Sequence, residues 1–182
     1  MRRIILVVAL LACIPFSAQE TRRKLVRQSP DPAEDRKPNS KQVPDGYAIS
    51  GNLKRVVVLR FKYGTDLLAG LENMVKQEKI RNALILSGLG SVRNFQVHQV
   101  GNRDLPPKDV YVKNPTGSAD IISMSGVVID GRVHPHITLA NADKAFGGHL
   151  EPDTTVFTFA VVTLGVLDDS VDLGKVDDWN YR

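Results

Sequence analysis

The sequence RVVVLRFKYGTDLLAGLENMVKQEK, residues 55–79, contains the pattern of a strand followed directly by the pattern of a helix. The β-branched and apolar run at 55–61 predicts a strand. Gly64, Thr65 and Asp66 then supply a turn and a helix cap. The apolar residues that follow recur at helical spacing, which predicts an amphipathic helix ending near Lys79. These residues are Leu67, Leu68, Leu71, Met74 and Val75.

The rest of the chain is typical of strands joined by short turns. Apolar or β-branched runs predict strands at 83–87 (ending at Gly88-Leu89-Gly90), 95–99, 110–112 (an edge strand), 119–129, 133–139 and 156–166. One helix with six or seven strands in short succession favours an α+β domain with a largely antiparallel sheet. The helix covers one face of that sheet, so the other face needs a cover that a second copy of the chain could supply.

Composition excludes several classes of protein. The chain has 182 residues, one cysteine, 14 Gly, 10 Pro and a formal net charge of +4. A single cysteine excludes a disulfide-stapled miniprotein, and the Gly and Pro counts exclude collagen-like and low-complexity chains. The basic residues are not clustered, so the charge does not favour a nucleic-acid partner.

The N-terminus is typical of an exported protein. Arg2 and Arg3 precede the apolar run 4–12, which is too short for a membrane-spanning helix and predicts a signal peptide over 1–18. Leu10-Leu11-Ala12-Cys13 resembles a bacterial lipobox, which makes Cys13 a lipidation candidate and the product a lipid-anchored envelope protein. Ordinary cleavage after Ala18 would instead release a periplasmic protein without a cysteine, and both routes remain open.

The mature chain divides into three parts. Residues 19–45 hold four prolines among charged residues and predict a disordered linker. The folded domain is predicted over 46–167. Residues 168–182 form an acidic C-terminal tail that we expect to be loosely ordered.

Three of the four histidines, His134, His136 and His149, fall within sixteen residues. Side chains two apart in a strand share one face, about 6.5–7 Å apart. The turn-forming residues 141–143 allow the chain to return antiparallel, and Gly147-Gly148 permits close backbone geometry beside the third ring. Three neutral imidazoles with an open fourth position form the ligand set of a zinc site; ordinary surface histidines on a polar strand are the alternative.

Other residues near this hairpin have weaker signals. Asp143 and Glu151 flank it, and either could orient a ligand imidazole or act as a catalytic base; a turn aspartate and a solvated glutamate are the plain alternatives. His98 falls on a different predicted strand, beside two glutamines, so we expect it to be a surface residue outside the cluster.

The stretch GRVHPHITL, 131–139, followed by FGGHL, 146–150, resembles the His-x-His and Gly-Gly-His-Leu signature of the plant and prokaryote conserved (PPC, or PCC) domain family. Segments 55–61, 64–68, 86–91 and 121–126 resemble further landmarks of that family in the same order, so the resemblance covers about residues 47–167.

This resemblance implies an α+β fold with a seven-stranded antiparallel sheet and a homotrimer. It also implies that His134, His136 and His149 bind a metal, with zinc expected. Plant members carry the domain beside AT-hooks built on Arg-Gly-Arg-Pro, and this sequence has no such motif. The resemblance is therefore to the stand-alone prokaryotic type.

Three classes of function follow. The first is an exported trimeric metal-binding domain that binds an unidentified small molecule or carries out a metal-assisted reaction, so enzyme activity stays an open question. The second is a DNA-associated module, which family labelling suggests and the export signal disfavours. The third is a purely structural oligomerisation domain.

Overall fold

The computed structural model describes residues 22–27, 41–105 and 107–177, with side chains from 41 onward. The predicted signal peptide, Cys13 and most of the predicted linker lie outside the described residues. No helix in the described part of the chain is long and apolar enough to span a membrane.

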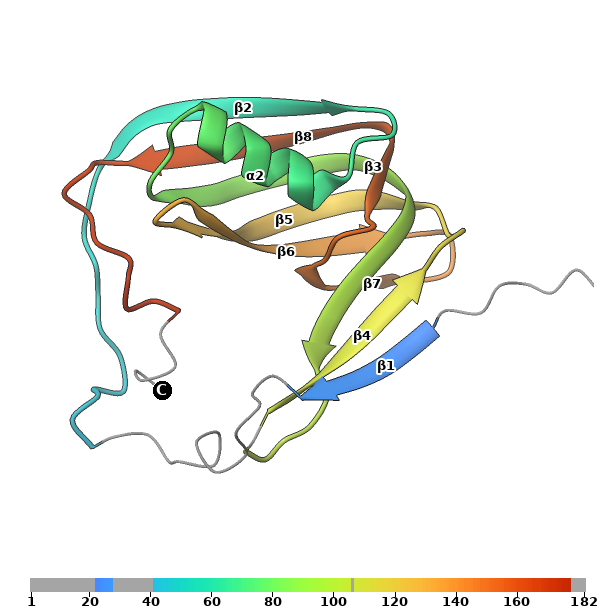
Figure 1. Ribbon diagram of the computed structural model, residues 1–182, viewed down its shortest axis with the longest axis horizontal. Coiled ribbons are helices and arrows are strands. Elements are labelled where there is room, and N and C mark those ends of the chain that lie inside the picture. Colours follow the sequence, from blue (N-terminus) through green and yellow to red (C-terminus); the bar gives the residue numbers. More distant parts are fainter. Residues whose placement is uncertain (1–21, 28–40, 106, 178–182) are drawn as a thin grey trace, which may run out of the picture.

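The domain is a single antiparallel sheet with a helix packed on one face (Figure 1). Seven strands arise from the region predicted to be folded: β2 (Leu53–Lys62), β3 (Ala83–Val100), β4 (Lys108–Asn114), β5 (Ala119–Ile129), β6 (Arg132–Ala140), β7 (Ala145–Leu150) and β8 (Thr155–Leu167). All strand pairings are antiparallel. The helix is α2 (Leu67–Gln77), which confirms the predicted α+β class.

Helix α2 forms where the sequence predicted it. The Asp66 side chain accepts a hydrogen bond from the Ala69 backbone N–H at 3.0 Å, which satisfies one of the free donors of the first turn. Leu67, Leu71 and Val75 lie on one stripe and are buried against the sheet. The sheet therefore has a covered face, toward α2, and an outer face.

The long strand β3 differs from the two separate strands predicted at 83–87 and 95–99. It continues through Gly88 and Gly90, with register shifts against β8 in this region. Its first half pairs with β5 and β8, while its second half pairs with β4 and β7. The irregular pairing lets the strand bend and exchange neighbours rather than end. This bend carries residues 95–100 toward the hairpin formed by β6 and β7.

An additional strand lies outside the predicted domain. Residues Arg22–Arg27 form β1, which pairs antiparallel with β4, whereas the sequence predicted a linker there. The edge of β4 presents free backbone N–H and C=O groups that any extended segment can satisfy, whatever its side chains. Propensity alone did not reveal this pairing, because the paired residues are far apart in the sequence: 81 positions at Arg27–Lys108 and 91 at Arg22–Lys113.

Candidate metal centre

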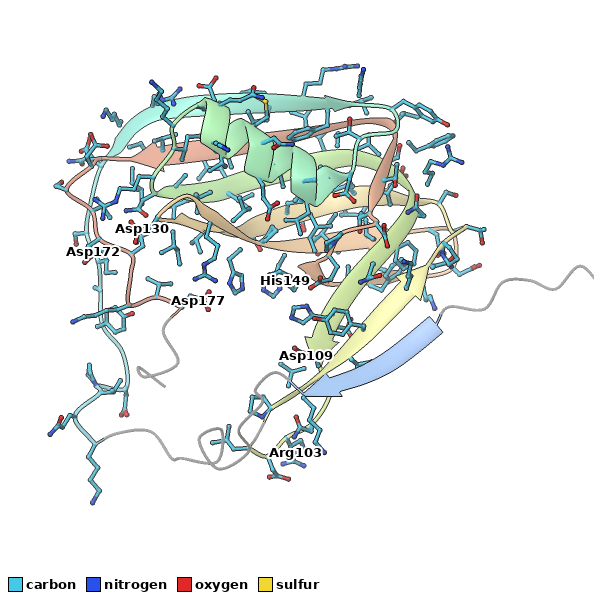
Figure 2. The ribbon with its side chains drawn as sticks, in the orientation of Figure 1. Arg103, Asp109, Asp130, His149, Asp172 and Asp177 are labelled. Carbon is cyan, nitrogen blue, oxygen red and sulfur yellow. The ribbon has the colours of Figure 1, made fainter. Side chains whose placement is uncertain are left out.

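Strands β6 and β7 bring the three predicted histidines to one place. His134 and His136 share a face of β6, with ring centroids 5.4 Å apart. His136 pairs directly with His149 across the β6–β7 ladder. The His149 ring centroid lies 4.8 Å from that of His134 and 5.5 Å from that of His136. Figure 2 shows His149 in the middle of the molecule, below the sheet strands β5 and β6.

Two glycines allow β7 to fit between β6 and β3. A Cβ atom at Gly147 would lie 2.1 Å from the Ile137 carbonyl oxygen on β6. A Cβ atom at Gly148 would lie 2.3 Å from the His98 carbonyl oxygen on β3. Neither distance is sterically possible, so the Gly-Gly pair permits the close approach that places His149 between its neighbours.

His98 belongs to the cluster, and the prediction that it is an isolated surface residue was wrong. It pairs with His149 across the β3–β7 ladder, and the two rings stack with centroids 4.6 Å apart. Only 21% of the His98 side chain is exposed. The bend in β3 causes this approach, and a strand prediction from local sequence contains no signal of such a bend.

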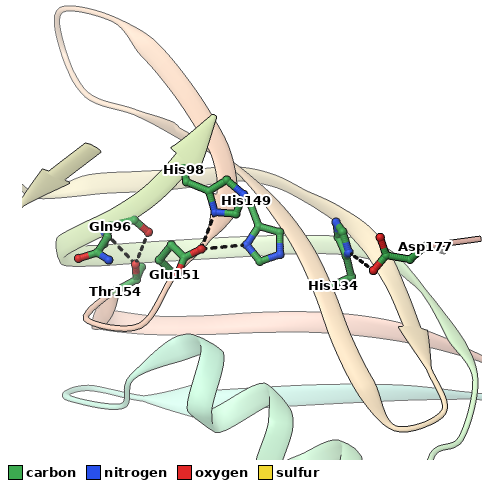
Figure 3. A network of polar contacts seen from close by, with 7 residues as sticks. All are labelled: Gln96, His98, His134, His149, Glu151, Thr154 and Asp177. Atoms are coloured by element: carbon green, nitrogen blue, oxygen red, sulfur yellow. Dashed lines mark hydrogen bonds and ion pairs between the residues drawn. The ribbon is translucent and has the colours of Figure 1, made fainter. Parts of the chain in front are cut away.

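Glu151 also joins the cluster, and it follows β7 by one residue. Its Oε1 atom lies 2.5 Å from His98 Nδ1 and 3.3 Å from His149 Nδ1 (Figure 3). The proposed role of Glu151 in orienting an imidazole is therefore geometrically available. Asp143 lies too far from the rings for the same role, because it is in the turn at the opposite end of the hairpin. Three ladder pairs separate His136–His149 from the final pair Ala140–Ala145.

A second carboxylate approaches from the C-terminal segment. Asp177 Oδ2 lies 2.9 Å from His134 Nδ1 and 2.9 Å from Arg132 Nη1. Burial alone would raise the pKa of Asp177, but the hydrogen bonds and charges of His134 and Arg132 lower it below the ordinary value. The carboxylate is therefore ionised and acts as an acceptor at neutral pH.

The imidazole rings of His149 and His136 favour the neutral, unprotonated form. Burial, together with the nearby His98, His134 and His136, lowers the pKa of His149 to about 4. Burial and the neighbouring His134 and His98 also lower the pKa of His136. Neutral imidazole is the form that coordinates a metal, so these two rings need lose no proton to bind one near pH 7.

Tyr111 extends the same face onto β4, and sequence reasoning did not identify it. It pairs with His98 across the β3–β4 ladder, and the two ring centroids are 5.2 Å apart. Burial, with the carboxylates of Glu151 and Asp109, raises the pKa of Tyr111, so its hydroxyl keeps its proton and can donate a hydrogen bond.

The spacing of the imidazole rings is compatible with a metal ion among them. Nitrogen–zinc bonds of about 2.0–2.1 Å in a tetrahedral arrangement place imidazole centroids about 5 Å apart, close to the spacing among His134, His136 and His149. Among the described residues, the group whose donor atoms all lie within 4.8 Å of one another is His98, His149 and Glu151, and it does not include His134 or His136. His149 Nδ1 is a buried nitrogen with no hydrogen-bond partner among the described residues. Such an atom is costly unless something binds it.

Comparisons with known proteins place the chain in a family. The model of the Plants and Prokaryotes Conserved (PCC) domain matches residues 48–168, and the chain belongs to that family. A PPC protein from Pyrococcus horikoshii has a similar structure, with 26% identity and a TM-score of 0.56 over 69% of this chain and 87% of that one. The metal-containing protein AF0104 from Archaeoglobus fulgidus has 25% identity and a TM-score of 0.54, over 68% and 86% of the two chains.

One relative is a much longer protein, and this chain matches only a small part of it. The bifunctional protein GlmU from Synechococcus sp. (strain JA-2-3B'a(2-13)) is 30% identical over 118 residues, or 63% of this chain. The aligned segment spans only 17% of that protein. The likeness therefore concerns one domain-sized portion of a much longer chain.

Proposed function

We propose that this PCC domain is a zinc-binding centre in which His134, His136 and His149 hold the ion. The observation that carries the proposal is the position of His149, whose buried Nδ1 makes no hydrogen bond with the described residues and whose ring lies among three other imidazoles. The lowered pKa values of His149 and His136 support coordination at neutral pH. The similarity to AF0104, a metal-containing protein, supports the same function.

The residues around the proposed metal ion are suited to bind a small ligand or to assist a reaction. Zinc in such a site supplies a Lewis acid that polarises a bound carbonyl or phosphoryl oxygen. Glu151 lies beside His98 and His149 and can accept a proton, while the Tyr111 hydroxyl can donate a hydrogen bond to an anionic group. We therefore propose a small anionic or carbonyl-bearing molecule as the ligand, with Glu151 as the base if the domain is an enzyme.

Metal content of the purified protein tests this proposal. We expect about one zinc ion per chain by elemental analysis and native mass spectrometry, and almost none in His149→Ala. Asp143→Ala is the matched control, because its side chain lies at the far end of the same hairpin, and it should keep full occupancy. Wild-type protein without stoichiometric metal after zinc loading would refute the proposal.

We further propose that the domain forms a homotrimer through the outer face of its sheet. Large apolar side chains are exposed there: Val56, Val58, Leu84, Leu86, Leu89, Ile122, Phe157 and Phe159. Val58 retains 65% of its accessible surface, although its strand neighbours Leu59 and Phe61 are buried under α2. A group of eight large, exposed apolar side chains on one sheet face is typical of a subunit interface.

Export remains a proposal from the sequence. The mature protein would be periplasmic or held at the cell envelope by a lipid on Cys13. Inhibition of signal peptidase II separates the two routes: a lipoprotein precursor accumulates, whereas a protein cleaved after Ala18 is processed normally. Cys13→Ser should abolish membrane association in the first case only.

A further inference from the structure

The C-terminal segment 168–177 continues past the end of the family match, and the structure anchors it firmly. Val171 and Leu173 are buried in a small cluster with Ile129 and Leu167. The Asn82 side chain donates a buried hydrogen bond of 2.7 Å to the Val171 carbonyl. The loosely ordered tail expected from its acidic composition is therefore not observed over these residues, because two apolar side chains hold it to the domain.

The anchor directs the segment toward the histidine cluster. After Leu173, a turn closed by a 2.9 Å hydrogen bond from Val176 N–H to the Leu173 carbonyl leads to Asp177. Asp177 Oδ2 lies 2.9 Å from His134 Nδ1 (Figure 3). Arg132 Nη1 lies 2.9 Å from the same oxygen. The Asp177 carboxylate thus has two independent contacts on strand β6.

This contact decides which nitrogen of His134 is free. A carboxylate only accepts hydrogen bonds, so a neutral His134 ring must carry its proton on Nδ1. Nε2 then presents its lone pair, and the ring cannot rotate without breaking the hydrogen bond. A carboxylate behind a ligand imidazole is a recurrent way to orient the ring and increase its basicity.

We infer that Asp177 is a positioning residue of the metal centre, supplied by a C-terminal strap (residues 168–177) that extends beyond the matched domain, which ends at residue 168. The inference rests on the proposed metal function. The strap fixes the tautomer and orientation of His134 before any metal binds. It does for His134 what Glu151, within the domain, does for His98.

Two measurements on the full mature chain test the inference. In metal-free protein near pH 8, where histidine is neutral, long-range ¹H–¹⁵N NMR reports which ring nitrogen carries the proton. We expect the Nδ1–H form of His134 in wild type and a mixture of tautomers in Asp177→Ala. The zinc dissociation constant from chelator competition should rise about tenfold in Asp177→Ala.

Asp169→Ala is the matched control. It removes the same charge from the same strap, but Asp169 pairs with exposed Lys54 and touches no histidine. The loss of an exposed ion pair should change zinc affinity by less than about twofold. The His134 tautomer should match that of wild type.

The outcomes separate this inference from the proposed function. If wild type binds zinc but Asp177→Ala retains both the Nδ1–H tautomer and the affinity, the strap inference is wrong and the metal centre stands. Weaker binding with an unchanged tautomer also overturns it, since Asp177 would then act through charge alone. If wild type binds no zinc, the proposed function fails, and the tautomer still decides whether Asp177 orients His134.

Discussion

His149 belongs to both sets of donor atoms in the cluster. It lies with His134 and His136 at the spacing of a tetrahedral three-histidine site, and with His98 and Glu151 in a group of close donor atoms. The two sets share only His149: the first adds His134 and His136, and the second adds His98 and Glu151. Substitution of His136 and of His98 therefore distinguishes them.

We predict that His136→Ala loses zinc binding more completely than His98→Ala. In the three-histidine arrangement His136 bonds to the metal directly. His98 acts only indirectly, because it stacks on His149 and forms a hydrogen bond with Glu151. Loss of a neighbouring side chain of that kind costs about ten- to a hundredfold in affinity, less than loss of a ligand. Isothermal titration of both variants with zinc measures the difference, and the reverse order would assign the ion to His98, His149 and Glu151.

The lowered pKa of His149 makes the stability of the metal-free protein depend on pH. Its ring has a pKa of about 4 in the fold, below the ordinary histidine value of about 6.5. Between these values the unfolded chain binds a proton that the folded chain resists, so stability is full above about pH 6.5 and falls as the pH approaches 4. We expect a loss on the order of 1 kcal/mol, since solvent partly reaches the ring.

Urea unfolding of the chelator-treated protein at about pH 7 and pH 5 measures this loss. His149→Gln is the comparison, because it removes the titrating group while other carboxylates and histidines still titrate. The free energy of unfolding should fall less in the variant than in wild type. Equal losses would mean that His149 is not held neutral by the fold.

Among the elements, β7 depends on two adjacent glycines. Its hydrogen-bonded neighbours are β6 on one side and β3 on the other, and side chains at 147 and 148 would collide with the backbones of both. The Gly-Gly sequence is therefore a packing requirement that also decides where His149 lies. The register His98–His149–His136 follows from it.

We predict that Gly148→Ala destabilises the protein by about 1–3 kcal/mol, the usual cost of overpacking, and weakens zinc binding. The new Cβ atom would meet the His98 carbonyl oxygen, so β7 must move away from β3. Chemical unfolding and zinc titration measure the two effects. Gly46→Ala is the control, since a Cβ atom there meets nothing within 4 Å, and an equal effect at both positions would contradict the explanation.

At the scale of the whole molecule, the outer sheet face sets the expected assembly. We predict three subunits in native mass spectrometry, and dissociation to monomers in Val58→Asp, because a buried carboxylate in an apolar interface is strongly unfavourable. Asn73→Asp, on the exposed side of α2, is a control with the same change of charge away from the outer sheet face. A wild-type protein that is monomeric by light scattering at micromolar concentration would contradict the trimer.

The charge distribution also predicts little affinity for nucleic acid. Lys54, Arg55, Arg81, Lys113 and Arg132 each form an ion pair with a carboxylate of this chain. Cations already paired neutralise phosphates less effectively, so we expect no salt-sensitive binding to a duplex at low ionic strength. Fluorescence anisotropy with labelled DNA measures this; tight binding that falls steeply with salt would support a DNA-associated function.

The local sequence contained enough to predict most elements of this domain. Apolar and β-branched runs predicted most of the strands, and helical spacing with the Asp66 cap predicted α2. The His-x-His and Gly-Gly-His segments predicted that three rings meet. Each of these depends on residues a few positions apart, where backbone periodicity directly determines which side chains share a face.

Contacts between distant segments were decided only by the tertiary structure. His98 enters the cluster because β3 bends and exchanges partners, and Asp177 enters it because Val171 and Leu173 anchor the strap. Both residues lie tens of positions from the hairpin, and neither has a local pattern that signals its partner. Periodicity fixes the faces of a strand, whereas packing alone decides which faces of remote segments meet.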